Sequence, residues 1–228
     1  MTARALRAIV TARLRAERRA IFFGCSTAAI VGFIQPHGIA AITDPLTADV
    51  ATRSVWLAGP MFFCSAIGVA LALAQGQGRH GHLDIAERSA PLFGRELARA
   101  KAAAPLLAAT LTALVYWIAQ YLSGFAAPPT FFILALASVY ATTLVALNAT
   151  LYRGGHRAIA LLLCAGTVAI AYALAVYADP AQTQRGDAIG VATELLFCSV
   201  TGFVALRQYG EGLARFDPIP LNDLRRAR

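Results

Sequence analysis

One carboxylate, Glu194, stands inside a long apolar segment of this sequence. A charged side chain is costly in hydrocarbon, so Glu194 should face protein or water rather than lipid. It lies about five residues into segment 189–206, which places it about 7–8 Å deep at ~1.5 Å per residue. Two interpretations stay open. Glu194 lines a pathway or an interface, or it reaches the headgroups or is hydrogen-bonded by its neighbours.

Other polar side chains in the apolar segments are uncharged. Asn148, Tyr116 and Tyr140 are the candidates for the same pathway or interface as Glu194. Such groups also hydrogen-bond simply from helix to helix. No serine–histidine–aspartate set and no pair of carboxylates converges at one depth. The sequence therefore predicts no catalytic residue and gives little support to a membrane hydrolase.

Metal and nucleotide chemistry also find little support. His80 and His82 are two imidazoles, too few for a closed metal site, and the four cysteines all lie in apolar segments without a C-x-x-C pair. A P-loop needs a lysine in G-x-x-x-x-G-K-[ST], but Lys101, the only lysine, stands in Arg-Ala-Lys-Ala. We expect no cofactor or metal on this chain and no ATP hydrolysis by it.

Glu194 and the other polar side chains lie in apolar segments, and the composition of the chain indicates that these segments cross a bilayer. The chain has 228 residues, of which 58% are hydrophobic and 14% charged. In soluble domains, roughly 45–50% of residues are hydrophobic and about 25% are charged. A transmembrane helix needs about 20 mainly apolar residues. Six segments meet or approach that length, and they predict an all-α, six-span membrane protein: 20–34 (with an extension past Pro36 to 42), 55–75, 102–121, 130–152, 158–177 and 189–206.

The distribution of positive charge orients these spans. Of the 20 lysines and arginines, all except Arg53 and Arg185 fall on one side when the N-terminus is placed in the cytoplasm. Cytoplasmic loops carry such an excess of cations, so both termini should be cytoplasmic. The net charge of +8 then reflects orientation and contact with anionic membrane lipids. No nucleic-acid partner is needed to explain it.

We divide the chain into three parts. Residues 1–19 form an amphipathic interfacial helix, because arginines cover one face and apolar residues the other: Leu6, Ile9, Val10 and Leu14. Arg13 and Glu17 interrupt that apolar face at a spacing that allows them to pair. A solvated basic tail is the alternative. Residues 20–206 form the membrane domain, with a cytoplasmic segment at 76–101, and residues 207–228 form a cytoplasmic tail.

The segment 83–101 carries a family resemblance. It reads Glu87-Arg88-Ser89-Ala90-Pro91-Leu92, then Gly94-Arg95-Glu96-Leu97, and ends with Lys101. This pattern, the basic first helix and the six-span plan resemble the membrane subunits of ABC-2 type ATP-binding-cassette exporters. The resemblance covers the whole chain as architecture and about twenty residues as motif.

The resemblance implies a bacterial inner-membrane permease subunit that forms half of a transport pathway. A second permease subunit, identical or similar, would complete it, and a separate ATPase subunit would bind ATP and Mg. A coupling helix within 84–95 would dock on that ATPase. The coupling residues would be Asp84, Glu87, Arg88, Ser89, Pro91, Leu92, Gly94, Arg95 and Glu96.

The chain length and the Arg153-Gly-Gly turn also resemble the haem-exporter-type permeases of cytochrome c maturation. Alternatives from other classes are an ion-coupled secondary carrier or a membrane enzyme using Glu194, and an anchoring subunit without transport. A secondary carrier usually has broken helices or repeated halves, and neither is evident in the sequence.

Overall fold

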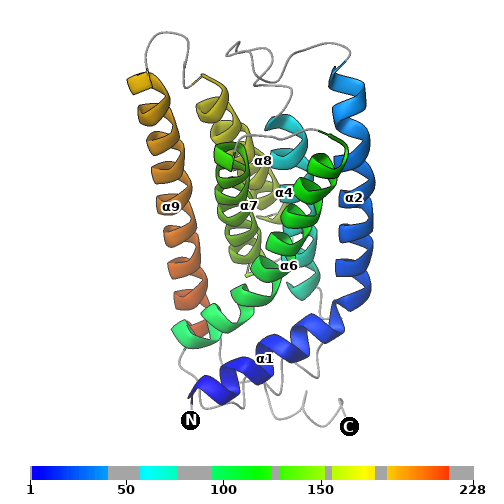
Figure 1. The fold of residues 1–228 in the computed structure, drawn as a ribbon. Helices are drawn as coiled ribbons and strands as arrows, with labels where there is room; N and C mark the ends of the chain where they lie inside the picture. Colours follow the sequence, from blue (N-terminus) through cyan, green and yellow to red (C-terminus); the bar gives the residue numbers. More distant parts are fainter. Residues whose placement is uncertain are drawn as a thin grey trace.

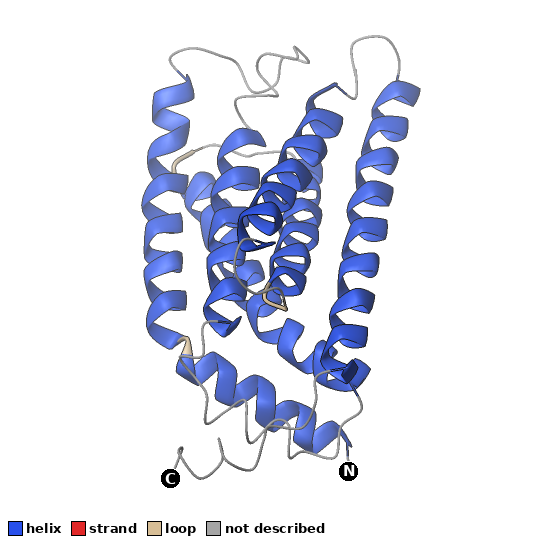
Figure 2. Cartoon of the chain, turned by 180° about the vertical axis from the view of Figure 1, so that it is seen from behind, coloured by secondary structure: helices blue, strands red, loops and turns tan. Residues whose placement is uncertain are grey.

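The computed structural model describes residues 2–40, 57–76, 94–124, 129–151, 156–177 and 184–215. All regular structure in these ranges is helical (Figures 1 and 2). The elements are α1 (Thr2–Ala16), α2 (Arg18–Ala40), the π-helix η1 (Gly59–Phe63), α4 (Cys64–Gly76), α6 (Gly94–Leu122), α7 (Pro129–Ala149), α8 (His156–Tyr177) and α9 (Gln184–Arg215). The predicted all-α class is confirmed.

The helices form one bundle, with α1 lying across one end of it (Figure 1). We call this end the α1 end and the opposite one the far end. Helix α2 runs from the α1 end to the far end, η1 and α4 return, and the alternation continues until α9 finishes at the α1 end. The most extensive contacts join α2 to α6 and α7 to α9. The first and last described helices thus reach the same end of the bundle.

Small residues let neighbouring helices approach closely. An added Cβ at Gly32 of α2 would stand 2.5 Å from the backbone carbonyl oxygen of Tyr116 in α6. An added Cβ at Gly68 of α4 would overlap the hydroxyl of Thr143 in α7. Alanines fill much of the remaining buried surface between helices. Interfaces of this kind are typical of helix packing in membranes, where close backbone approach replaces burial of large side chains.

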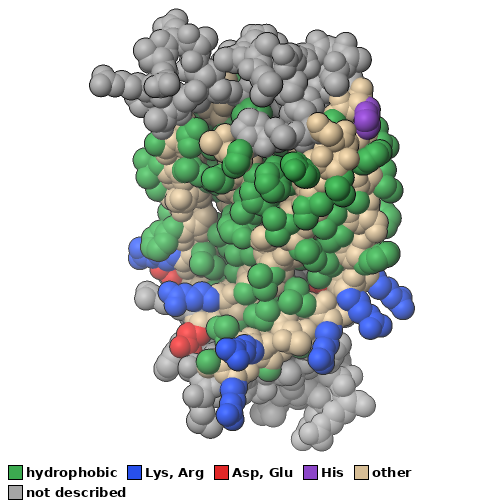
Figure 3. Space-filling model, viewed as in Figure 1, with side chains coloured by type: hydrophobic (Ala, Val, Ile, Leu, Met, Phe, Trp, Pro, Cys, Tyr) green, Lys and Arg blue, Asp and Glu red, His purple; other side chains and the backbone are tan. Residues whose placement is uncertain are grey.

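The outer surface of the bundle is apolar. Large side chains such as Phe22 (75% exposed), Phe23 and Leu162 point outward. Figure 3 shows this apolar surface along the length of the bundle, with the described lysines and arginines gathered toward the α1 end. Contiguous apolar surface of this extent requires a partner or a membrane.

Among the described residues, four helices are long and apolar enough to cross a membrane. They are Arg18–His37, Glu96–Leu122, Pro129–Ala149 and Gly190–Leu213, and two shorter apolar helices cover Gly59–Ala74 and Leu161–Val176. The membrane character predicted from composition is therefore supported. Six spans remain a prediction.

Two helices extend beyond the predicted membrane spans. Helix α6 begins at Gly94, so Pro105 lies in its interior. Proline removes one backbone hydrogen bond and bends a helix, and Figure 1 shows a change of direction in the lower part of α6. Helix α9 continues past Leu206 to Arg215. Residues 207–215, expected in a tail, are therefore helical.

Candidate functional site

Most of the predicted coupling segment lies outside the described residues. Asp84, Glu87, Arg88, Ser89, Pro91 and Leu92 belong to this undescribed part. Gly94, Arg95 and Glu96 form the start of α6, where the carboxylate of Glu96 lies in the first turn. An acidic side chain at a helix N-terminus is stabilised by the helix dipole. Of the predicted coupling residues, the described ones thus form the first turn of α6.

The start of α6 is buried against both ends of the described chain. Ile9 of α1 packs with Leu97 and Ala100 of α6, and Leu6 and Leu213 pack on this cluster. The apolar face of α1 was expected to lie on lipid, but part of it is buried in protein. We call this cluster the α1–α6–α9 junction.

Charged residues that interrupt the apolar face of α1 also lie against α6. Arg13 is fully buried. Arg13 and Glu17 line the same small cavity, of about 10 Å³, beside Pro105. Their spacing allows them to pair, and the structure places both at the end of α1, where it meets the bend of α6.

Glu194 is 0% exposed within the bundle. Neither of its carboxylate oxygens has a hydrogen-bond partner among the described residues. The apolar span of α9 begins at Gly190, so Glu194 lies about 6 Å into it at ~1.5 Å per residue, close to the depth that the sequence suggested. Because its side chain is fully buried, the carboxylate does not reach the surface of the described bundle. An isolated buried carboxylate is unfavourable as an ion, which makes Glu194 a candidate for proton or cation chemistry.

Tyr116 is buried at the far end. Its hydroxyl has no hydrogen-bond partner among the described residues and lies against Gly59 of η1, where a Cβ would collide with it. Close by, the Nε2 of Gln120 donates to the Oε1 of Gln35 over 3.4 Å, which links α6 to α2. Gly59 thus leaves room for polar groups between α2, α6 and the π-helix.

Tyr140 and Asn148 each link two helices. The hydroxyls of Tyr140 and Thr110 are hydrogen-bonded at 2.6 Å between α7 and α6. The Nδ2 of Asn148 donates to the Oε1 of Gln208 over 2.9 Å between α7 and α9. The pathway candidates proposed from the sequence therefore lie at different helix contacts, and these contacts do not join them into one site.

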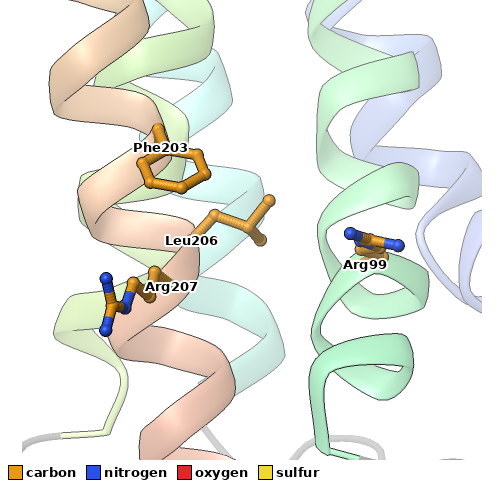
Figure 4. A pocket seen from close by; sticks show the side chains of 4 residues that line it. All are labelled: Arg99, Phe203, Leu206 and Arg207. Atoms are coloured by element: carbon orange, nitrogen blue, oxygen red, sulfur yellow. The ribbon is translucent and has the colours of Figure 1, made fainter.

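A cavity at the α1 end was not predicted. It has a volume of about 330 Å³ and lies between α6 and α9, and the described residues that line it are Arg99, Phe203, Leu206 and Arg207 (Figure 4). The sequence placed both arginines on the cytoplasmic side, but it gave no sign that α6 and α9 are neighbours. Two other cavities, one beside Tyr116 and one beside Arg13, have volumes of only about 10 Å³ each.

Metal ligands are not gathered in the described part of the chain, where no group of three or more His, Cys, Asp or Glu side chains could hold an ion. Cys25, Cys64, Cys164 and Cys198 are free thiols. Cys25 lies 3.9 Å from the Thr112 hydroxyl, and the other three are buried. His80 and His82 fall outside the described residues.

In the part of the chain that the structure describes, fold and site together define a helical bundle with helices suited to a membrane, a cationic α1 end and a buried carboxylate, Glu194, without a described hydrogen-bond partner. No family model, curated protein or solved structure matches the chain. The function must therefore be argued from the residues themselves.

Proposed function

We propose that this chain is the membrane permease subunit of an ABC-2 type exporter in a bacterial cytoplasmic membrane. It would cross the bilayer six times, with both termini in the cytoplasm. It would form half of a transport pathway together with a second permease subunit. ATP and Mg would bind to a separate ATPase subunit. The haem-exporter-type permeases of cytochrome c maturation are the narrower version of this proposal.

The α1–α6–α9 junction is the observation that carries the proposal. The predicted coupling segment runs into α6 without a described break after Gly94. The first turns of α6 are held between Ile9 of α1 and Leu213 of α9. A push on the coupling segment would therefore reach α6, α1 and α9 together, because packed side chains transmit displacement.

The six-span plan is supported by the alternation of the described helices. Four of them meet the length and composition needed to cross a bilayer, and η1 with α4, and α8, run parallel to these over shorter apolar lengths. Since short hydrophobic segments are accommodated by local thinning of the bilayer, all six passes can be membrane spans. The clustering of cations at the α1 end supports a cytoplasmic orientation for that end.

A charge-removal experiment tests the coupling role. The double substitution Glu87→Ala, Arg88→Ala should leave the protein in the membrane and abolish co-purification of a P-loop ATPase after mild cross-linking. Mg–ATP hydrolysis by the purified assembly should fall accordingly. The matched control, Asp44→Ala with Arg53→Ala, removes the same charges from a segment predicted on the other side and should change neither. The proposal fails if the wild-type chain brings down no nucleotide-hydrolysing protein, or if the chain alone carries out transport.

The buried carboxylate favours a second candidate function, an ion-coupled secondary carrier that uses Glu194. In that case the purified chain, reconstituted without any ATPase, should move protons or Na⁺ across vesicles, and Glu194→Gln should stop that movement. Glu211→Gln, a carboxylate change on the exposed part of the same helix, is the control. Ion flux that survives Glu194→Gln excludes this function.

A further inference from the structure

We infer that the cavity between α6 and α9 binds the headgroup of an anionic phospholipid from the leaflet at the α1 end. The phosphate would bind the guanidinium of Arg99, and Arg207, which points away from α6 in Figure 4, would turn toward it, with the acyl chains along the outer face of α9. This inference goes beyond the proposed function. It uses the membrane-spanning character of the bundle, and it does not depend on an ATPase.

The charge at the cavity suits a monovalent anion. Arg99 is exposed, and no described acidic residue forms an ion pair with it. The Nε of Arg207 donates to Glu211 over 2.9 Å, while the Arg207 side chain remains 65% exposed. That bond leaves the terminal Nη groups of Arg207 available to a ligand. Two arginines against one glutamate leave a single positive charge, which complements the phosphodiester of a phospholipid.

The apolar wall of the cavity favours a lipid over free phosphate. Figure 4 shows Leu206 directed toward α6, with Phe203 one turn further from the α1 end and Arg99 and Arg207 at a similar height. Phe203 is 67% exposed, and its neighbours Val200 and Val204 are also exposed on the surface of α9. Charged groups thus lie toward the α1 end and apolar groups toward the middle of the bundle, which is the polarity of a lipid in that leaflet.

The size of the cavity limits what it holds. Its volume of about 330 Å³ is near the lower end of the roughly 300–1,000 Å³ range of ligand pockets. That volume accommodates a phosphate and its glycerol but not two acyl chains. The chains must therefore lie outside the cavity, against the exposed side chains of α9. Basic pockets between helices at this depth are known lipid-headgroup sites in membrane proteins.

Native mass spectrometry of the full chain in a mild non-ionic detergent tests the inference. The probes are phosphatidylglycerol, phosphatidylcholine with the same acyl chains, and inorganic phosphate. The wild-type chain should retain phosphatidylglycerol with at least about a tenfold preference over phosphatidylcholine, because phosphatidylcholine adds a choline cation to the same phosphodiester and the arginines attract only the net anion. The substitution Arg99→Gln with Arg207→Gln should abolish that preference. Arg4→Gln with Arg7→Gln removes the same charge from exposed positions of α1 and should preserve it.

A second variant tests the cavity without changing the arginines, in case the Arg99→Gln, Arg207→Gln variant folds poorly. Leu206→Trp fills the cavity while keeping both arginines, and it should reduce phosphatidylglycerol retention to a similar extent. Equal retention of both lipids by the wild-type chain would overturn the inference. An equal loss of phosphatidylglycerol preference in the Arg4→Gln, Arg7→Gln control would also overturn it, because it would indicate general attraction to the charged surface. Retention of inorganic phosphate, without retention of phosphatidylglycerol, would overturn it as well. Since no ATPase is present, loss of ATPase co-purification in the earlier experiment leaves this result unaffected.

Discussion

The two ends of the bundle are closed in different ways. At the far end, Tyr116, Trp117 and Phe132 help to line a space of only about 10 Å³. The rings of Trp117 and Phe132 have centroids 5.4 Å apart, and those of Phe63 and Tyr116 are 6.1 Å apart. At the α1 end, arginines and exposed apolar groups surround about 330 Å³.

This difference indicates that one end of the bundle holds the helices in place and that the other end can bind a ligand. Aromatic side chains that fill their space hold helices in fixed relation, because close packing leaves few alternative arrangements. A cavity with cations on its wall accepts a ligand or a change of helix position. Movement and binding should therefore concentrate at the α1 end, while substitutions at the far end should act mainly on stability. Four variants break or sharpen that contrast.

The largest effect is expected from Gly32→Ala near the far end. The new Cβ would stand 2.5 Å from the carbonyl oxygen of Tyr116, which is backbone and cannot rotate away. The free energy of unfolding should fall by about 1–3 kcal/mol, the usual cost of overpacking. Gly166→Ala is the control, because no atom lies within 4 Å of its added Cβ. Thermal unfolding in detergent measures both, and equal melting temperatures would contradict the close packing of α2 on α6.

Tyr116→Phe should have a smaller effect of opposite sign. The hydroxyl is buried without a partner among the described residues, so removing it relieves the desolvation penalty and should raise the free energy of unfolding by about 1 kcal/mol. Tyr140→Phe is the matched control, since it loses the 2.6 Å bond to Thr110 and should lower stability by about 0.5–1.5 kcal/mol. If both variants lose stability to the same degree, the far end holds a polar partner for Tyr116.

Asn148→Ala probes the polar contact near the cavity. It removes the 2.9 Å hydrogen bond to Gln208, and such bonds in membrane bundles contribute about 0.6 kcal/mol. Gln208→Ala should cost the same, and the double variant should cost no more than either one. A double-mutant cycle on unfolding in detergent measures the coupling. Full additivity would show that the bond contributes nothing.

Glu211→Gln should change stability least and binding most clearly. Its ion pair with Arg207 is largely exposed, so its loss should cost at most about 0.5 kcal/mol. Removing the carboxylate frees Arg207 for a phosphate and should therefore increase phosphatidylglycerol retention. The expected increase is about threefold or more, which is near the low end of what one charge contributes to the binding of an anionic lipid. In the Arg99→Gln, Arg207→Gln background the same change should have no effect. Unchanged lipid retention in the wild-type background would argue against a role for Arg207.

The helices themselves were largely predictable from the sequence. Apolar runs bounded by proline, glycine or charge locate α2, α7 and α8, because a bilayer demands a continuous apolar length. The same reasoning bounds two spans at 102 and 206, whereas α6 begins at Gly94 and α9 continues to Arg215. Arg95–Lys101 and Arg207–Arg215 are polar, but arginine, glutamate and lysine are good helix formers, so both helices continue beyond the apolar run.

The site was less predictable, for a different physical reason. Arg99 and Arg207 were both assigned to the cytoplasmic side, yet nothing in their spacing shows that α6 and α9 are neighbours. Helix pairing is decided by small residues such as Gly32 and Gly68, and a small residue does not specify which partner it meets. Glu194 lies fully buried and without a hydrogen-bond partner among the described residues, and this setting depends on which helices pack against α9 rather than on the sequence around it.

The α1–α6–α9 junction has a consequence for how the chain is assembled. Ile9 belongs to the first described helix, and Leu213 lies near the end of the last one. Because synthesis proceeds from the N-terminus, α1 leaves the ribosome before α6, which supplies Leu97 and Ala100, and long before Leu213 of α9. Completion of the junction is thus a late event in biogenesis, and until α6 is inserted the apolar stripe of α1 must rest on the bilayer or on another protein.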